Sequence, residues 1–410
     1  MTVSTEGRAG EAGIGAPFGA GWRAEREREQ QLALPDGRLV VSCSAPFGAG
    51  GLGRHMREIV EAAARNGQEP TCLCAPGGPL AESGLREEGV GEEGVGEEGM
   101  REQGVREQAV RVDVNRGGRQ RVLDALLRRS TPWRMWSASA GFDRAAARLA
   151  PEGHHLIAFS SQALLQLRSA ERRGVRSLGL VSPTSHLGEV SRRYERAWRR
   201  HPFERPWTPR ILNRALAEYG LVERIYVSTP YVRDSFLREG FDESRLVLLP
   251  LTPDPRFTAP AGEQRRGSSF EVLYVGGLSV VKGVPLLVEA FRRLPSRDLR
   301  LRLHGGWESR GMRRWLQGAC AADERIEICS GDPLASMRSA SLYVHPSYED
   351  GFAYSAAEAL ACGLPVLVSE NTGMQTLLEP GRTGAVLPTG DVDALTEAIE
   401  AAHRGELLSR

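Results

Sequence analysis

Short runs of apolar residues, separated by longer stretches with helical spacing, recur along most of the 410-residue chain. Such runs are typical of buried strands, and the stretches between them of amphipathic helices. Strands that alternate with helices form parallel sheets, connected by right-handed crossovers. The pattern predicts strands at residues 38–44, 156–159, 178–181, 225–228 and 246–249, and then at 272–275, 299–303, 325–329, 341–345 and 365–369.

A proline-rich linker separates these two sets of strands; it contains Pro250, Pro253, Pro255 and Pro260. We therefore predict an α/β protein of two Rossmann-like domains, whose parallel sheets face each other across a cleft. The predicted N-terminal domain covers residues 37–255 and the C-terminal domain residues 265–410. Residues 1–36 mix glycine with charge and lack apolar periodicity, which predicts a mobile tail.

A tandem five-residue repeat fills residues 86–110 and reads REEGV, GEEGV, GEEGM, REQGV, REQAV. Its period matches neither a helix nor a strand, and it carries eight Glu against three Arg. Because polar repeats cannot bury a core, we predict a solvated surface loop rather than a binding segment.

Charge and composition exclude several classes of protein. The 53 Lys and Arg nearly balance the 52 Asp and Glu, whereas nucleic-acid-binding proteins carry a basic excess. No apolar run is long enough to span a bilayer, and the N-terminal residues are charged where a signal peptide would be apolar. The six cysteines form no Cys-x-x-Cys pair, which favours a reducing compartment and disfavours a metal site. We expect a cytoplasmic protein without a metal or cofactor.

Arginines and aromatic residues are interleaved in residues 191–219, which hold eight Arg and three Glu. The favoured interpretation is a solvated helical hairpin with its tryptophans packed inward. The alternative is a peripheral contact with an anionic membrane at its inner face, where lipid-linked acceptors would lie.

The segment with the clearest chemical signal is residues 345–366, which read HPSYEDGFAYSAAEALACGLPV. It follows a predicted strand, turns at Gly351 and enters an alanine-rich helix, whose N-terminus can bind a phosphate through free N–H groups. Glu358 lies among apolar residues of that helix and can accept two hydrogen bonds from ribose hydroxyls. Asp350 can accept from sugar hydroxyls in the same way. The alternative for Glu358 is a pairing with a nearby arginine.

Two glycine-rich loops precede this segment. Residues 275–283 read VGGLSVVKG, in which the glycines allow a diphosphate to approach the backbone and Lys282 supplies positive charge. Residues 50–55 read GGLGRH and join the first strand to the first helix of the predicted N-terminal domain. Either loop alone also fits an ordinary tight turn.

These segments resemble the retaining GT-B glycosyltransferases of glycosyltransferase family 4. The resemblance covers residues 38–75 and 180–402 in the family's order and includes two acids eight positions apart, Asp350 and Glu358. This chain departs from the family at Asp350, where Glu is usual, at Ala353, where Gly is common, and at Gly277, where many relatives have Arg.

The resemblance implies transfer of a sugar from a nucleotide diphosphate sugar to a hydroxyl acceptor, with retention of configuration. The acceptor is a glycan, a lipid-linked molecule or a small molecule. The expected catalytic residues are His186, on a loop that would face the cleft, Lys282 and Asp350. The expected donor-binding residues are Gly50, Gly51, Gly277, Lys282, Asp350, Gly351, Phe352, Ala353 and Glu358.

Two other functions remain open at this point: a catalytically weak nucleotide-sugar-binding subunit, and a GT-B epimerase or phosphorylase. The chain continues for only eight residues after the last helical pattern, at residues 392–402, whereas family members usually add helices that cross back to the N-terminal domain. On this basis we expect few contacts between the domains and a large motion of one against the other.

Overall fold

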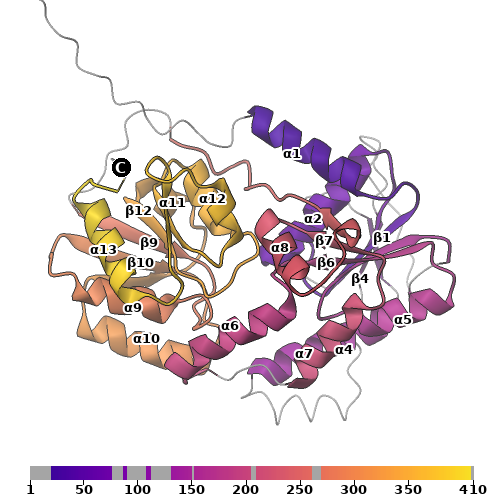
Figure 1. Ribbon diagram of the computed structural model, residues 1–410, viewed down its shortest axis with the longest axis horizontal. Helices are drawn as coiled ribbons and strands as arrows, with labels where there is room; N and C mark the ends of the chain where they lie inside the picture. The colour runs from indigo at the N-terminus through magenta and orange to yellow at the C-terminus, as the bar shows by residue number, and fades with distance from the viewer. Residues whose placement is uncertain are drawn as a thin grey trace, which may run out of the picture.

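The computed structural model describes residues 20–75, 86–89, 108–111, 131–149, 152–204, 209–260 and 269–407. Within them, two parallel sheets lie side by side, each with helices against its faces (Figure 1). The first sheet has eight strands in the order β3-β4-β2-β1-β5-β6-β7-β8, and the second has six in the order β11-β10-β9-β12-β13-β14. This is the α/β architecture predicted from the apolar runs.

The first sheet is built from residues 39–248. Its strands are β1 Leu39–Cys43, β2 Thr71–Cys74, β3 Arg86–Gly89, β4 Gln108–Arg111, β5 His155–Phe159, β6 Ser177–Ser182, β7 Arg224–Val227 and β8 Leu246–Leu248. The helices of this half are α1 Ala20–Ala33, α2 Gly50–Arg65, α4 Thr131–Ala146, α5 Leu164–Arg172, α6 Leu187–Arg200, α7 Pro209–Tyr219, α8 Pro230–Arg238 and the short 3-10 helix η2 Glu243–Arg245. The central strands β1 and β5 are buried at every position, as expected of a sheet covered on both faces.

The second sheet is built from residues 270–387. Its strands are β9 Phe270–Val275, β10 Leu299–His304, β11 Ile326–Cys329, β12 Leu342–His345, β13 Val366–Ser369 and β14 Gly384–Leu387. Its helices are α9 Val284–Arg293, α10 Arg310–Ala322, α11 Leu334–Ser339, α12 Tyr354–Ala361, α13 Val392–His403 and the short 3-10 helix η3 Gly373–Leu377. Strand β9 lies between β10 and β12, so the loops after β9 and β12 leave the same edge of the sheet side by side.

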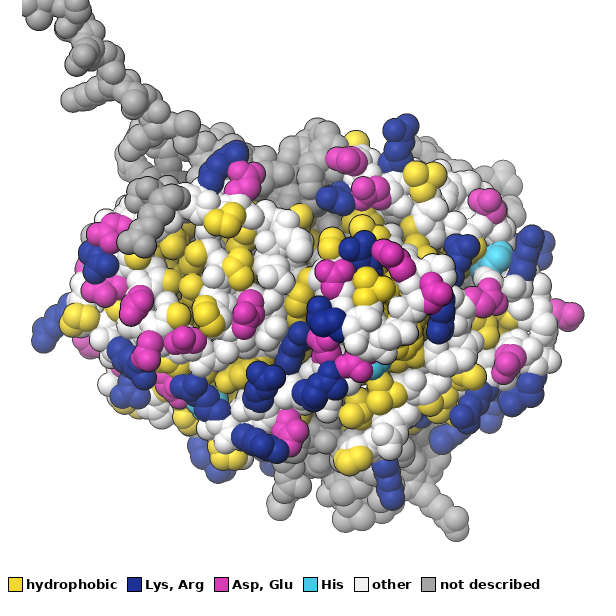
Figure 2. All heavy atoms as spheres, in the orientation of Figure 1, with side chains coloured by type: hydrophobic (Ala, Val, Ile, Leu, Met, Phe, Trp, Pro, Cys, Tyr) yellow, Lys and Arg dark blue, Asp and Glu magenta, His cyan; other side chains and the backbone are white. Residues whose placement is uncertain are grey.

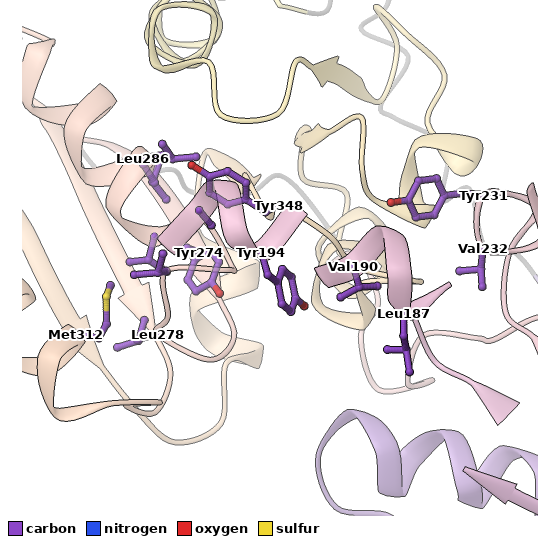
Figure 3. Close-up of a cluster of buried hydrophobic side chains, with 14 of the residues drawn as sticks. Leu187, Val190, Tyr194, Tyr231, Val232, Tyr274, Leu278, Leu286, Met312 and Tyr348 are labelled. Atoms are coloured by element: carbon purple, nitrogen blue, oxygen red, sulfur yellow. The ribbon is translucent and has the colours of Figure 1, made fainter. Parts of the chain in front are cut away.

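Helix α6 crosses from the first half of the molecule to the second (Figure 1). Its buried residues Leu187, Val190 and Tyr194 belong to one apolar cluster with residues of both sheets, and Figure 3 shows Tyr194 near Tyr274 of β9. Beyond the helix, the Glu204 carboxylate accepts hydrogen bonds from the Val280 amide and the Ser309 hydroxyl, both at 2.9 Å. The expectation of few contacts between the two halves is therefore wrong for this structure.

Most of the α6 arginines pair with carboxylates. Arg193 contacts Glu189 and Arg199 contacts Glu195, both at 2.6 Å, and Arg200 contacts Glu289 at 3.0 Å. Acidic and basic side chains are interspersed on the face of the molecule drawn in Figure 2. These contacts favour a solvated helix over a membrane-binding surface. No helix in the described ranges is both long and apolar enough to cross a membrane.

Two predictions need correction. The prediction of a mobile tail is wrong for residues 20–33, because they form helix α1. In this helix the Gln30 side chain is buried and donates to the Pro250 carbonyl at 2.6 Å. The prediction of a surface loop at residues 86–110 is wrong at both ends of that range, because β3 and β4 pair with each other there and β4 also pairs with β2. Residues 1–19 and 90–107 lie outside the described residues.

Candidate active site

The loops after β9 and β12 bring Lys282 and Asp350 together. The Lys282 ammonium donates to Asp350 Oδ2 at 2.6 Å, and the side chains are 29% and 18% exposed. His345, the last residue of β12, lies within 3.0 Å of the same carboxylate oxygen through Nε2. A Cβ on Gly283 would lie 1.9 Å from the Pro346 carbonyl oxygen, so glycine is required for Lys282 to reach this position.

The charges of this pair stabilise each other. Burial raises the pKa of Asp350, but Lys282 and His345 outweigh it and hold this pKa well below its usual range. Burial lowers the pKa of Lys282, and Asp350 more than offsets this effect. Asp350 is therefore ionised, and the Lys282 cation lies beside it at this edge of the sheet.

The same loop touches the N-terminal half of the chain. Glu349 is fully buried, and its Oε1 accepts a hydrogen bond from the Ser185 amide at 2.8 Å. The Thr229 hydroxyl donates to the Gly351 carbonyl at 2.9 Å. A Cβ on Gly351 would lie 2.1 Å from the Pro183 carbonyl oxygen, so a larger residue would push the two halves apart.

Helix α12 begins directly after this loop. Ala353, its N-cap residue, has φ +62°, a left-handed conformation that favours glycine. Its amide donates to Asp350 Oδ1 at 3.0 Å. One of the three amides expected to bind a diphosphate is thus already engaged with Asp350, while Gly351 and Phe352 stand beside it.

Glu358 is paired with an arginine from the other half of the chain. Arg54 Nη1 donates to Glu358 Oε1 at 2.5 Å, and the Glu358 side chain is 5% exposed. Burial raises the pKa of Glu358, and Arg54 opposes this effect without cancelling it. The local pairing considered from the sequence is therefore not what the structure has: the arginine that pairs with Glu358 lies 304 positions away.

The glycine loop at the start of α2 is open. Ala49 makes no side-chain cap at this helix N-terminus, and a Cβ on Gly50 or Gly51 would meet no atom within 4 Å. Beside it, a hollow of about 350 Å³ lies between α1, α2 and linker residues 252–255, and Arg54 and Glu58 line it. At the other glycine loop, the Gly277 carbonyl accepts from the Tyr274 hydroxyl at 2.9 Å.

His186 does not face these groups. Its ring packs against Tyr219, Phe236 and Phe241, with centroids 5.0 to 5.4 Å apart, and its Nδ1 accepts from the Gly188 amide. The prediction that His186 faces the cleft is therefore wrong. The preceding residue, Ser185, makes the contact with the candidate site instead.

Sequence reasoning missed three residues of this site: Arg54, His345 and Glu349. Arg54 lies inside the glycine loop that drew attention, and His345 and Glu349 lie inside the segment with the strongest signal. The sequence therefore predicted the segments that contain these three residues, but not the residues with which they pair. Within the described ranges, no group of three or more His, Cys, Asp or Glu side chains is placed to hold a metal ion.

Comparison with solved structures shows the fold. Sucrose-phosphate synthase from Thermosynechococcus elongatus aligns over 91% of this chain and 92% of its own, with TM-score 0.65 and 18% identity. Anabaena HepE, solved in complex with UDP and glucose, aligns over 91% and 92%, with TM-score 0.60 and 14% identity. The chain therefore has the GT-B architecture, two Rossmann-like halves that meet at a cleft.

Comparison of sequences finds relatives that match part of the chain. The D-inositol 3-phosphate glycosyltransferase of Paenarthrobacter aurescens (strain TC1) is 26% identical over 209 residues, which are 46% of this chain and 51% of that protein. That of Nocardia farcinica (strain IFM 10152) is 32% identical over 143 residues, 32% of each. The chain thus spans about half the length of the first of these relatives, and less of the second. Residues 269–404 match the family model described as glycosyl transferases group 1.

Proposed function

We propose that the protein transfers a sugar from a nucleotide diphosphate sugar to a hydroxyl acceptor, with retention of configuration. The observation that carries this proposal is the Lys282–Asp350 contact of 2.6 Å at the sheet edge that meets the N-terminal half, followed eight residues later by the buried Glu358. The match of residues 269–404 to glycosyl transferases group 1 supports it.

Each group has a distinct role in this reaction. Glu358 accepts the ribose hydroxyls, and Asp350 accepts hydroxyls of the donor sugar. Lys282 and the amides of Gly351 and Phe352 stabilise the diphosphate as the glycosidic bond breaks. The Ala353 amide donates to Asp350 Oδ1 and holds that carboxylate in place. In this proposal Gly50, Gly51 and Gly277 let the backbone approach the phosphates. The first half of the chain binds the acceptor, which is a glycan, a lipid-linked molecule or a small molecule.

His186 has no role in the proposed mechanism, because its ring is enclosed by aromatic residues. We place the reaction in the cytoplasm, because none of the six cysteines, all of which lie in the described residues, forms a disulfide, and this favours a reducing compartment.

The test is donor binding and hydrolysis by the purified protein. UDP-glucose is the first donor to try, because the matching structures include proteins solved with UDP and glucose and with UDP-2-fluoro glucose. A donor that binds the folded state raises the melting temperature, and a transferase slowly hydrolyses it without acceptor. The anomeric configuration of the released or transferred sugar, followed by NMR, tests retention.

The outcomes separate the remaining alternatives. Binding without hydrolysis or transfer would favour a catalytically weak binding subunit. Conversion of the donor into an isomer, or phosphorolysis of a glycan, would favour the epimerase or phosphorylase. Failure to bind any of the UDP, GDP, ADP and dTDP sugars would contradict the proposal.

A further inference from the structure

The ion pair between Arg54 and Glu358 joins the two halves of the molecule at the proposed ribose site. Arg54 lies in the first turns of α2, and Glu358 lies in the middle of α12. Their side chains are 18% and 5% exposed, and Arg54 Nη1 is 2.5 Å from Glu358 Oε1. When two charges are this well buried, removing one leaves the other without compensation.

Neighbouring side chains fix the position of Arg54. Its guanidinium lies over the Tyr354 ring, 4.2 Å from the ring centroid. The Tyr354 hydroxyl donates to Glu58 Oε1 at 2.8 Å, and Glu58 Oε2 accepts from the Gln30 side chain and the Thr252 amide, both at 3.0 Å. The Arg54 guanidinium therefore packs on the face of the Tyr354 ring, and the Tyr354 hydroxyl is hydrogen-bonded to the N-terminal half.

This arrangement leaves the Glu358 carboxylate able to bind a ligand. An ionised carboxylate has about four lone-pair positions, and the contact with Arg54 is made to Oε1. Two ribose hydroxyls can donate to the remaining positions while the arginine stays in place. A protonated carboxyl group would be a poorer acceptor for both hydroxyls.

We propose that Arg54 is a positioning residue of the donor site, which holds the Glu358 carboxylate ionised and oriented to accept the hydroxyl pair of a nucleoside diphosphate. This inference rests on the proposed function, in particular on the ribose role of Glu358. It means that the nucleoside site of the C-terminal half is completed by the N-terminal half, so the two halves bind the donor together.

Burial raises the pKa of the Glu358 carboxyl group, and Arg54 has the largest opposing effect on this pKa. The other charged or titratable groups that act on Glu358 or respond to it come from the linker, β12 and α12 with its C-terminal end: Asp254, Arg256, Tyr343, Tyr354 and Cys362. Glu58 of α2 acts on Arg54 and on Tyr354 instead. Asp254 adds to the rise, and the contribution of Arg256 is smaller than that of Arg54. Loss of Arg54 therefore shifts Glu358 towards its neutral form at neutral pH.

The experiment is calorimetric titration of UDP, GDP and ADP into the full chain at about pH 6 and about pH 8.5. Arg54→Met keeps the length of the side chain without its charge and should weaken binding at the lower pH, because loss of the arginine leaves less of the Glu358 carboxylate ionised. Binding should recover at the higher pH, while the wild type changes little. Arg54→Lys should restore most of the affinity. Arg57→Met, on the same helix with a more exposed side chain, is the matched control.

The outcomes are decisive in each direction. Arg54→Met binding with wild-type affinity at both pH values overturns the inference, and tighter binding shows instead that Arg54 competes with the donor. An equal loss at both pH values, with no rescue by Arg54→Lys, means a merely structural role and also overturns it. If the wild type binds none of the three nucleotides, the proposed function fails. If the wild type binds, Glu358→Gln does not and Arg54→Met is unchanged, only the role of Arg54 fails.

Discussion

Replacing Glu349 with Gln tests the electrostatics of the contact between the two halves. Glu349 is fully buried, its Oε1 accepts the Ser185 N–H, and its Oε2 has no hydrogen-bond partner. Burial raises the pKa of this carboxyl group to about 7; the Ser185 N–H lowers it, Asp350 raises it, and Lys282 and Arg193 lower it. Glutamine keeps the acceptor for Ser185 but cannot ionise.

The sign of the pH effect follows from proton binding. In the unfolded chain this carboxyl group has an ordinary pKa near 4.5, so the folded protein binds more protons than the unfolded chain between about pH 4.5 and about pH 7. The stability due to the protonated form is complete below about pH 4.5 and is lost as the pH rises through about 7. The shift of about 2.5 units corresponds to at most about 3 kcal/mol of unfolding free energy.

Urea unfolding of the wild type and Glu349→Gln at about pH 5 and about pH 8 measures this effect. At the lower pH the variant should be slightly less stable, because its buried amide lacks a partner, by about 1 kcal/mol. At the higher pH it should be more stable, and the difference between variant and wild type should change by up to about 3 kcal/mol between the two conditions. Glu195→Gln, whose carboxylate is 59% exposed on α6, is the control and should show no such change. A stability difference that is the same at both pH values would refute the reasoning.

Four further predictions concern the site and its surroundings. Asp350→Asn should lower kcat by about 100-fold or more with nucleotide affinity nearly unchanged, because the Lys282 charge loses its partner beside the sugar. Steady-state kinetics and nucleotide titration measure both quantities, and a fall in affinity as large as the fall in kcat would contradict this prediction. Ala353→Gly should raise the unfolding free energy by about 1 kcal/mol by relieving the left-handed backbone, and a loss of stability in urea would contradict this. Activity should survive dialysis against EDTA, and a complete loss that Mg²⁺ or Mn²⁺ restores would count against charge compensation by Lys282. Removing repeat units between residues 91 and 105, with β3 and β4 kept, should change unfolding free energy by less than about 1 kcal/mol, since loop-closure entropy varies slowly with length.

The sheets were predictable because buried parallel strands are apolar at nearly every position. Runs such as residues 272–275 and 365–369 therefore stand out, and the structure has β9 and β13 there. Strands β2 and β14, with sequences TCLC and GAVL, are less apolar, and no apolar run predicted them. Helix α1 is rich in Arg, Glu and Gln, so it shows no apolar periodicity. It contacts the rest of the fold through a tertiary hydrogen bond from Gln30 to the Pro250 carbonyl, which a local sequence pattern does not reveal.

The candidate site was predictable in its residue types and not in its pairings. Lys282, Asp350 and Glu358 were marked by glycine turns, acid spacing and a polar residue in an apolar helix. The partner of Glu358 is 304 positions away, and a local pattern carries no information on such a contact. The prediction that the His186 side chain faces the cleft failed for the same reason. The aromatic residues that enclose its ring come from α7, from α8 and from the residues that follow α8.

The course of α6 affects how this chain can be recombined with others. A cut in the linker near Pro253 is the simplest way to exchange the C-terminal half between proteins of this architecture. Here such a chimera would leave two side chains facing a foreign partner: Tyr194, which lies near Tyr274 of the second half, and Glu204, which accepts a hydrogen bond from the Val280 amide. The modules of this protein are therefore not its two sheets. A workable graft must carry residues 187–204 with the second sheet, or rebuild the surface on which that helix rests.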